Sequence, residues 1–460
     1  MKKIAEKEQV AIREIKRDAK IGDARAQYAL SEILFNSGNK SEALAWLKKS
    51  ALKDFPNACF TMATFQMAGI SVPYDAFGAR INLSKASNQG HADAQLLLSQ
   101  LARSGYGGEK NKSLANDLLL DLAKKSHPIA LCGVAILLHI RNEMNNTVDL
   151  LLEEAALKGS HIAAYIQADK MRDASLAGDV VARNHRIKKL FISANAGNQL
   201  AISELIEYKE SVVKEVLNTA SFSSTIKSNL NFKRIEEVIV RDVKYDFDQP
   251  EILSKENNIV SYKKFLTPLE CTYIKAAAAQ TIQPSNTIHP ITGKLIKNTI
   301  RTSSSSNFDP VSRDCVIYAI DERIAAASGT NVDQGEPLNV LYYRIGEEYK
   351  FHHDYLPDTG KEKMTLLKES GQRKYTFLIS MNEGYSGGET FFPDLNLMYR
   401  GQLGDALLFQ NLHNDGSVNK LMRHAGLPLI KDCKWIASKW IREKKFAFGT
   451  PSYISTRSKN

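Results

Sequence analysis

Residues 349–357, YKFHHDYLP, place two adjacent histidines directly before an aspartate. A β-strand directs successive side chains to opposite faces, so residues i and i+2 share a face. If this stretch is a strand, His352 and Asp354 lie on one face and His353 points away from them. An imidazole and a carboxylate on the same face are suited to binding a metal ion. We therefore expect His352 and Asp354 to be metal ligands and His353 to be non-catalytic.

Two later residues extend this pair into a larger constellation. His424 lies in another strand-like run, and Lys434 lies ten residues beyond it. Two imidazole nitrogens and one carboxylate oxygen suit Fe(II) and leave three coordination positions open, which a 2-oxo acid and O2 can fill. The distal carboxylate of 2-oxoglutarate would need a buried cation, because an unpaired buried charge is costly. Lys434 is the candidate for this cation, and a hairpin that starts at His424 would place it in the pocket. Lys431 and Lys439 are alternative candidates, but both fit a solvent-exposed position better.

Length and composition limit the classes of protein to which this chain can belong. A chain of 460 residues is expected to form two or three domains. The net charge of +10 comes from scattered basic residues without a dense Lys/Arg block, which favours a basic surface over a nucleic-acid site. The charged N-terminus has no apolar signal core, and the apolar stretch 129–140 is too short to span a bilayer. Five widely spaced cysteines without a CxxC pair suit buried thiols in a reducing compartment. We expect a cytoplasmic protein that binds neither nucleic acid nor membrane.

A small-residue motif recurs through the first half of the chain. The spacings between its aligned alanines are 32, 36, 36, 33 and 38 residues, and these alanines are Ala26, Ala58, Ala94, Ala130, Ala163 and Ala201. Each motif opens a predicted helix, and a second apolar-periodic helix follows it, as in residues 41–53. A period in the thirties with two helices per unit indicates an α-solenoid. Phrases such as 25-RAQYAL and 42-EALAWLKKSA resemble Sel1-like repeats, relatives of the tetratricopeptide family, which implies a surface for binding a protein partner.

The second half of the chain has a different pattern of predicted secondary structure. Residues 211–257 read as a linker with a strand or two, including the alternating run 236-EEVIVRDVKYDF. Helices are expected from residue 267, where Thr267 and Glu270 form a capping box, and over 310–329. Seven strand-like runs with Gly-containing turns follow. This pattern predicts a β-sandwich or jelly roll of the kind that includes the cupins, with flanking helices.

Residues 258–446 resemble the catalytic domain of the prolyl 4-hydroxylase family of Fe(II)/2-oxoglutarate dioxygenases. The matching phrases occur in order: 264-KFLTPLEC, Arg301–Ser303, 339-NVLYYRIGEEYKFHHDY, 371-GQRKYTFLISMNE, 387-GGETFFP, 404-GDALLF and 424-HAGLPLIKDCKWIASKWIR. The resemblance implies a double-stranded β-helix with the metal at one mouth. We therefore expect five parts: an N-terminal helix (1–21), helical repeats (22–210), a linker (211–257), the oxygenase domain (258–446) and a tail (447–460).

The same resemblance implies roles for individual residues. The iron ligands fall on His352, Asp354 and His424. The residues for 2-oxoglutarate fall on Lys434, Tyr343 and Thr376. The residues that contact a peptide substrate fall on Tyr349, Arg373 and Trp440. A histidine that is common in the family two residues after the tryptophan is Arg442 here, which weakens the expected peptide contact at that edge.

The implied reaction is hydroxylation of an unactivated C–H bond, coupled to decarboxylation of 2-oxoglutarate to succinate and CO2. It requires Fe(II) and O2, and ascorbate is a further expected cofactor. The segments 281–299 and 356–372 are expected to close over the substrate. A prolyl residue of a protein or peptide recruited by the repeats is the leading substrate. Two alternatives are a hydroxylase of a free amino acid or other small metabolite, and a repeat-based adaptor with a residual oxygenase domain.

Overall fold

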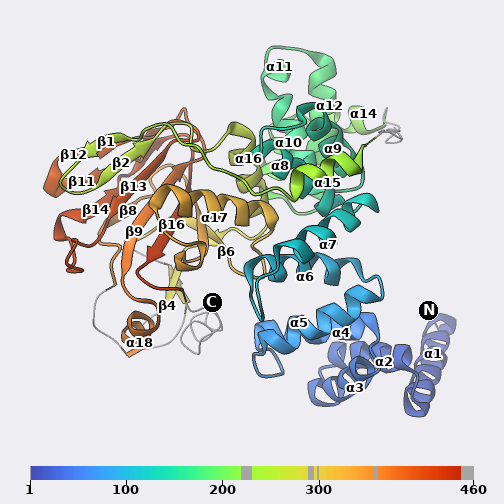
Figure 1. Ribbon diagram of the computed structural model, residues 1–460. Helices are drawn as coiled ribbons and strands as arrows, with labels where there is room; N and C mark the ends of the chain where they lie inside the picture. Colours follow the sequence, from blue (N-terminus) through green and yellow to red (C-terminus); the bar gives the residue numbers. More distant parts are fainter. Residues whose placement is uncertain (1, 219–229, 289–294, 298–299, 357–360, 447–460) are drawn as a thin grey trace. The chain divides into compact units, whose positions relative to one another are not determined.

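The computed structural model describes residues 2–218, 230–288, 295–297, 300–356 and 361–446 (Figure 1). The expected tail, 447–460, and parts of both expected closing segments lie outside these residues. The chain forms two compact units, Met1–Ala130 and Leu131–Asn460. Among the described helices, none combines the length and apolar character needed to cross a bilayer.

The first unit is an array of helices. Its elements are α1 (Lys2–Ile21), α2 (Ala24–Asn36), α3 (Lys40–Leu52), α4 (Pro56–Ala68), α5 (Ala76–Asn88), α6 (Ala92–Ser104) and α7 (Lys112–Lys124). Helix α2 packs on α3, α4 on α5 and α6 on α7, so each repeat is a helix pair. The side chains of Asp23, Asp75 and Asn111 accept hydrogen bonds from the first turns that follow them, which satisfies donors that a helix leaves free at its start.

Helical repeats continue into the second unit. They comprise α8 (Pro128–Ile140), which begins at the end of the first unit, α9 (Asn145–Leu157), α10 (His161–Lys170), α11 (Arg172–Leu176), α12 (Val180–Asn195) and α13 (Gln199–Ile206). The repeat alanines open α2, α4, α6, α8, α10 and α13, and all except the partly exposed Ala26 are completely buried. Small side chains at these positions allow neighbouring helices to approach closely. The α-solenoid predicted from the repeat is therefore present.

The connector is more helical than its sequence pattern suggested. It contains α14 (Glu210–Asn218) and α15 (Phe232–Ile239), and its only described strand is β1 (Glu251–Ser254). The prediction of a strand within 236–247 was wrong. Ile235, Val238 and Ile239 share one helical face and are buried together, and this 3.6-residue periodicity outweighs the local alternation.

The remaining elements build a barrel of two facing sheets. The strands are β2 (Ile259–Tyr262), β3 (Gln283–Pro284), β4 (Asn286–Ile288), β5 (Leu295–Lys297), β6 (Ser304–Phe308), β7 (Leu338–Tyr343), β8 (Tyr349–His352), β9 (Arg373–Ser380), β10 (Ser386–Gly387), β11 (Thr390–Phe392), β12 (Leu397–Tyr399), β13 (Ala406–Gln410), β14 (His424–Gly426), β15 (Leu429–Lys431) and β16 (Lys434–Arg442). The helices are α16 (Pro268–Ala278), α17 (Cys315–Ser328) and α18 (Lys361–Ser370), with short 3-10 turns at Val332–Gln334, Pro393–Leu395 and Lys420–Met422.

The major sheet has the order β1-β2-β13-β9-β16-β7-β6-β3, and the minor sheet has the order β12-β11-β14-β8. All the pairings are antiparallel. Two short pairs, β10-β15 and β4-β5, complete the arrangement. This is the double-stranded β-helix expected from the sequence. The capping box of Thr267 and Glu270 is also present at the start of α16.

The side chains of strand β9 point alternately to the two faces of the major sheet. Phe377 packs against Phe265, with ring centroids 4.8 Å apart, on the face that carries the aromatic cluster. The alternate residues Thr376 and Leu378 face the interior of the barrel, where Leu378 packs against Leu341 and Ile436. The two segments expected to close over the substrate, 281–299 and 356–372, contain regular structure in their described parts, namely the β4-β5 pair and α18.

The later repeat helices pack directly on the oxygenase domain within the second unit. Helix α10 lies against α16. The Thr272 hydroxyl donates to an Asp169 carboxylate oxygen at 2.8 Å, and His139 Nε2 lies 2.8 Å from Thr267 Oγ1. The Gln280 amide donates to the Ala196 carbonyl at 3.0 Å. Helices α8 to α13 thus form part of the folded body that carries the catalytic domain.

We expect a variant that starts at residue 243 to be much less stable than one that starts at residue 127. Removing the helices before residue 243 uncovers the buried side of α16 and strips partners from its polar side chains, which costs several kcal/mol. Urea unfolding of both variants measures the difference. Equal midpoints would show that the barrel is independent of these helices.

Candidate active site

Two histidines from neighbouring strands face each other inside the barrel mouth. His352 ends β8, His424 begins β14, and the two residues are register partners in the minor sheet. Their ring centroids are 4.3 Å apart. Asp354 lies just beyond the end of β8, and the chain still returns its carboxylate to the side that His352 occupies. The described residues thus bring together a His, Asp and His cluster whose ligand atoms all lie within 4.8 Å of one another.

Backbone carbonyls set the orientation of both imidazoles. His352 Nδ1 lies 2.7 Å from the Lys350 carbonyl oxygen, and His424 Nδ1 lies 3.0 Å from the Met422 carbonyl oxygen. A carbonyl only accepts, so each Nδ1 must carry the proton and each Nε2 presents its lone pair. Burial lowers the pKa of His424 to about 4, which keeps this ring neutral at physiological pH. Both rings are thus oriented with Nε2 available to a cation.

The carboxylate of Asp354 completes the cluster. One oxygen lies 3.5 Å from His352 Nε2 and the other lies 3.6 Å from His424 Nε2. Ligand atoms that bind one ion at about 2.1 Å can be at most about 4.2 Å apart, so these separations fit a shared cation. Burial alone would raise the pKa of Asp354, but the neighbouring histidines and Arg373 hold it well below its usual range. Asp354 is therefore ionised.

His353 points elsewhere, as the i and i+2 argument predicts. Its Nε2 lies 3.0 Å from the Lys420 carbonyl oxygen, and its ring packs beside Tyr355. The argument was wrong in one detail, because β8 ends at His352 and Asp354 is not part of the strand.

Lys434 projects into the same pocket from the opposite sheet. It begins β16 and is the register partner of Tyr343 on β7. Its ammonium donates to the Gly388 carbonyl at 2.6 Å and has no carboxylate partner among the described residues. Burial lowers the pKa of Lys434 to about 8, and Arg400 adds to this effect. Burial also raises the pKa of Tyr343 to about 12, so its hydroxyl stays protonated and can donate.

The expected hairpin from His424 to Lys434 was wrong in its pairing. Strand β14 belongs to the minor sheet, β15 pairs with β10, and β16 lies in the major sheet. The imidazole and the ammonium consequently line the pocket from facing walls. Of the rival lysines, Lys431 is exposed as expected, whereas Lys439 is buried and forms an ion pair with Asp321 at 2.6 Å. Neither lines the pocket.

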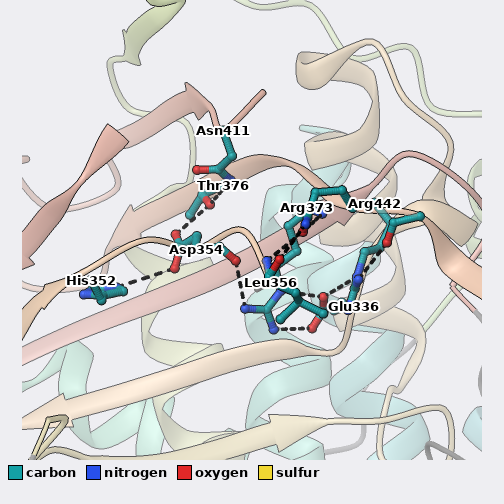
Figure 2. A network of polar contacts seen from close by, with 10 residues as sticks. Glu336, His352, Asp354, Leu356, Arg373, Thr376, Asn411 and Arg442 are labelled. Carbon is teal, nitrogen blue, oxygen red and sulfur yellow. Dashed lines mark hydrogen bonds and ion pairs between the residues drawn. The ribbon is translucent and has the colours of Figure 1, made fainter. Parts of the chain in front are cut away.

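Thr376, which the sequence assigns to 2-oxoglutarate, lies beneath the pocket wall. It is fully buried, and the described pocket lining does not include it. Its hydroxyl donates to Asp354 Oδ2 at 2.7 Å and accepts from Asn411 Nδ2 at 2.9 Å (Figure 2). Thr376 therefore contacts a metal-binding side chain, and its expected contact with 2-oxoglutarate stays a prediction.

Of the residues expected to contact a peptide, two form the rim of the pocket and the third supports that rim. Tyr349 and Trp440 line the pocket, and the Tyr349 ring stacks on His352 with centroids 3.5 Å apart. Arg373 lies over the Trp440 ring, with 3.8 Å to its centroid, and donates to the Asp354 carbonyl at 3.2 Å. The described lining does not include Arg373, so its observed contacts support the rim from outside the pocket.

Glu336 holds this support together and was not found from the sequence. Its carboxylate accepts two hydrogen bonds from Arg373, at 2.7 and 2.8 Å, and one from Arg442 at 2.6 Å (Figure 2). Arg442 is completely buried and also donates to the Gly371 carbonyl. The arginine that replaces the family's histidine is thus a buried structural residue.

Two other residues escaped the sequence analysis. Thr390 is buried in the pocket wall on β11, inside the quoted phrase 387-GGETFFP but without an assigned role. Asn411 carries no local signal, because it follows β13 in a turn rich in polar residues. Its importance appears only through its contact with Thr376.

The residues 338–442 match the model of the 2OG-Fe(II) oxygenase superfamily. Prolyl 4-hydroxylase 1 of Arabidopsis thaliana is 36% identical over 210 residues, which cover 43% of this chain and 72% of that protein. Prolyl 4-hydroxylase 5 of the same plant is 32% identical over 215 residues, with 43% and 72% covered. The chain belongs to the prolyl 4-hydroxylase family of Fe(II)/2-oxoglutarate oxygenases.

Two solved structures are among those to which the chain is similar. The viral collagen prolyl hydroxylase of Paramecium Bursaria Chlorella virus-1 is 25% identical, covers 40% of this chain and 95% of its own, and has a TM-score of 0.31. A Sel1 repeat protein from Oxalobacter formigenes is 26% identical, covers 26% of this chain and 93% of its own, and has a TM-score of 0.25.

The enzyme is a 2-oxoglutarate-dependent dioxygenase that uses Fe(II), 2-oxoglutarate and O2. The side chains of this oxygenase fit these groups. Two imidazoles and one carboxylate would hold Fe(II). Lys434 offers a buried ammonium, without a carboxylate partner among the described residues, for the distal end of 2-oxoglutarate. Bound iron supplies the activation of O2, and the chain supplies orientation and exclusion of water.

We expect the affinity for 2-oxoglutarate to fall above pH 8. Only the protonated Lys434 attracts the distal carboxylate, and its pKa in the free protein is about 8. The dissociation constant should therefore rise by about tenfold per pH unit above this value, until the higher pKa of the complex is reached. Equilibrium dialysis of the metal-loaded protein between pH 7 and 9.5 measures it. The control is 2-oxobutanoate, which lacks the distal carboxylate and should show no comparable rise; identical profiles for both acids would contradict the assignment.

We expect Glu336→Gln to lower the free energy of unfolding by about 3–5 kcal/mol at pH 7, because two buried guanidinium groups lose their carboxylate. Burial by itself raises the pKa of Glu336, but Arg373 and Arg442 bring it below its ordinary value. The stability that it adds is therefore present at neutral pH and is lost as the pH falls through the depressed pKa. Urea unfolding measures the effect. Glu237→Gln, in an exposed pair with Arg234, should cost less than about 1 kcal/mol, and a comparable cost in both variants would contradict the prediction.

Proposed function

We propose that this dioxygenase hydroxylates a prolyl residue of a protein or peptide. The observation that carries the proposal is the pocket that joins the His, Asp and His cluster, Lys434 and an aromatic rim. Tyr349 and Trp440 present ring faces beside the metal-binding side chains. Such a rim suits the compact, apolar ring of proline. The curated relatives reported above are prolyl 4-hydroxylases, and this supports the choice of proline.

The chain's own residues would divide the work. His352, Asp354 and His424 hold the metal, while Lys434 and Tyr343 orient 2-oxoglutarate. Tyr349 and Trp440 position the substrate ring, and Arg373 keeps Trp440 in place. The segments 281–299 and 356–372 are the proposed closing elements.

The test is anaerobic loading with Fe(II) and 2-oxoglutarate, followed by O2, with and without protein fractions from the host. We expect protein or proline-containing peptides to stimulate succinate formation and to gain one oxygen atom on a prolyl residue, detected by mass spectrometry. Stimulation by free amino acids or other small metabolites alone would contradict the proposal and identify a small-molecule hydroxylase.

We also propose that the helical repeats recruit the substrate protein. A variant that lacks residues 1–126 removes the helices of the first unit and keeps α8 complete. It should turn over a short proline peptide as the full chain does, and its KM for an identified protein substrate should rise at least tenfold. An unchanged KM would show that these repeats do not take part in recruitment.

We infer a cytoplasmic location for the enzyme. All five cysteines are free, and four of them are buried, which supports a reducing compartment. We further propose that ascorbate sustains turnover, an expectation that comes from the family resemblance. Fractionation with fluorescence microscopy tests the location. Product yield over many turnovers, with and without ascorbate, tests the second proposal.

A further inference from the structure

A relay of hydrogen bonds ends on one oxygen of the Asp354 carboxylate (Figure 2). Asn411 Nδ2 donates to Thr376 Oγ1 at 2.9 Å, and Thr376 Oγ1 donates to Asp354 Oδ2 at 2.7 Å. The exposed fractions of the three residues are 0%, 0% and 4%. The relay is thus shielded from solvent, where hydrogen bonds to a charged group are strong.

The chemistry of the three groups determines the direction of the relay. Ionised Asp354 can only accept hydrogen bonds, so the Thr376 hydroxyl must donate its single proton to Asp354 Oδ2. Thr376 can then only accept from Asn411, and Asn411 must present its NH2 group instead of its carbonyl oxygen. The Asn411 backbone is held at both ends, because its N–H donates to the Lys374 carbonyl at 2.8 Å and its carbonyl accepts from Asn419 N–H at 2.9 Å. The amide donor is therefore fixed in place.

The relay makes the two oxygens of Asp354 unequal. Oδ2 already accepts a short hydrogen bond, which draws electron density from this oxygen and occupies one of its lone pairs. Oδ1 lies 3.5 Å from His352 Nε2 and accepts no hydrogen bond from the relay, whereas Oδ2, which lies 3.6 Å from His424 Nε2, accepts the Thr376 proton. On the other side of the residue, Arg373 holds the Asp354 main-chain carbonyl, which fixes the backbone from which the carboxylate projects.

We propose that Asn411 and Thr376 are positioning residues that keep Asp354 a one-oxygen ligand of the metal. A carboxylate that bound through both oxygens would occupy a further coordination position, and 2-oxoglutarate needs two positions beside the one left for O2. The relay thus preserves the open positions. This inference concerns the metal site and does not depend on which substrate is hydroxylated.

Thr376→Val removes the hydroxyl and keeps the shape of the side chain. Co(II) is the probe, and its visible absorption reports both metal binding and the later addition of 2-oxoglutarate. We expect the Co(II) dissociation constant to stay within about threefold of wild type or to decrease, because the freed oxygen can join the ligand set. The dissociation constant of 2-oxoglutarate for the Co(II)-loaded protein should rise about tenfold, because this oxygen now competes for a position.

A loss of affinity for 2-oxoglutarate without a loss of affinity for Co(II) separates this role from a structural one. If Thr376 only oriented Asp354, its loss would weaken metal binding, by about 10–100-fold for such outer partners. Co(II) binding weakened by more than about tenfold, or an unchanged affinity for 2-oxoglutarate, would overturn the proposal.

Three further variants complete the test. Thr376→Ser keeps the hydroxyl and should restore both affinities. Asn411→Asp replaces the donor with a second acceptor that competes for the Thr376 proton, and it should shift both affinities in the same directions as Thr376→Val. Ser380→Ala removes another buried hydroxyl from β9, outside the relay and the pocket lining, and should change neither affinity. A loss of 2-oxoglutarate binding in Ser380→Ala equal to that in Thr376→Val would also overturn the proposal.

Discussion

Replacing Lys434 by methionine should raise the half-saturating concentration of 2-oxoglutarate at least about 100-fold. Methionine preserves much of the volume of the lysine stem and removes the ammonium. The distal carboxylate would then be buried without a cation, at a cost of about 3–5 kcal/mol, and each 1.4 kcal/mol corresponds to about a factor of ten in affinity. Initial rates of succinate formation against 2-oxoglutarate concentration measure the change.

Two controls make the Lys434 result specific. Lys431→Met alters an exposed lysine three residues earlier and should leave the half-saturating concentration within about twofold. Binding of 2-oxobutanoate, which has no distal carboxylate, should be nearly the same in Lys434→Met and wild type. If the two lysine variants behave alike, or if 2-oxobutanoate is affected as strongly as 2-oxoglutarate, the ammonium does not anchor the distal carboxylate.

His352→Ala should reduce succinate formation by at least about 1000-fold, because a cation that loses one of three protein ligands is bound weakly and in the wrong geometry. His353→Ala should retain at least about one third of the wild-type rate. Its ring contacts the Lys420 carbonyl and Tyr355 and does not belong to the cluster. Succinate assays together with Co(II) titration of the apo-proteins measure both activity and metal binding.

The adjacent positions of these two histidines provide a closely matched pair. Each variant removes one imidazole from the same short segment, so general effects on this edge of the barrel are shared. Far-UV circular dichroism and urea unfolding establish that both proteins fold. Equal loss of activity in two folded variants would contradict the division of roles between His352 and His353.

The interaction of Glu336 with two arginines explains why the departure from the family pattern at residue 442 does not break the site. Arg442 is buried, binds Glu336 and leaves the rim to Trp440. The same carboxylate holds Arg373 against the Trp440 ring. A replacement that looks like the loss of a substrate contact is therefore compensated by a support that the local sequence does not reveal.

Several features of this protein were determined by the sequence alone. The repeat period and the small residues at fixed positions specified paired helices, because close helix approach tolerates only small side chains at the contact. The capping box specified the start of α16, because its hydrogen bonds are local. The i and i+2 relation separated His352 from His353 by their order in the chain alone, although β8 ends at His352.

Other features were decided by tertiary structure, because they join residues that are distant in the chain. Lys434 reaches the site from the sheet opposite His424, although only ten residues separate them. Thr376 meets Asp354 and Asn411 through contacts 22 and 35 residues apart, and Glu336 meets Arg442 across 106 residues. Ile235, Val238 and Ile239 adopt a helix because the fold buries their shared face. Periodicity encodes the exposure of each residue along its own element, whereas the identity of its partner depends on how the sheets close, and no local pattern records that.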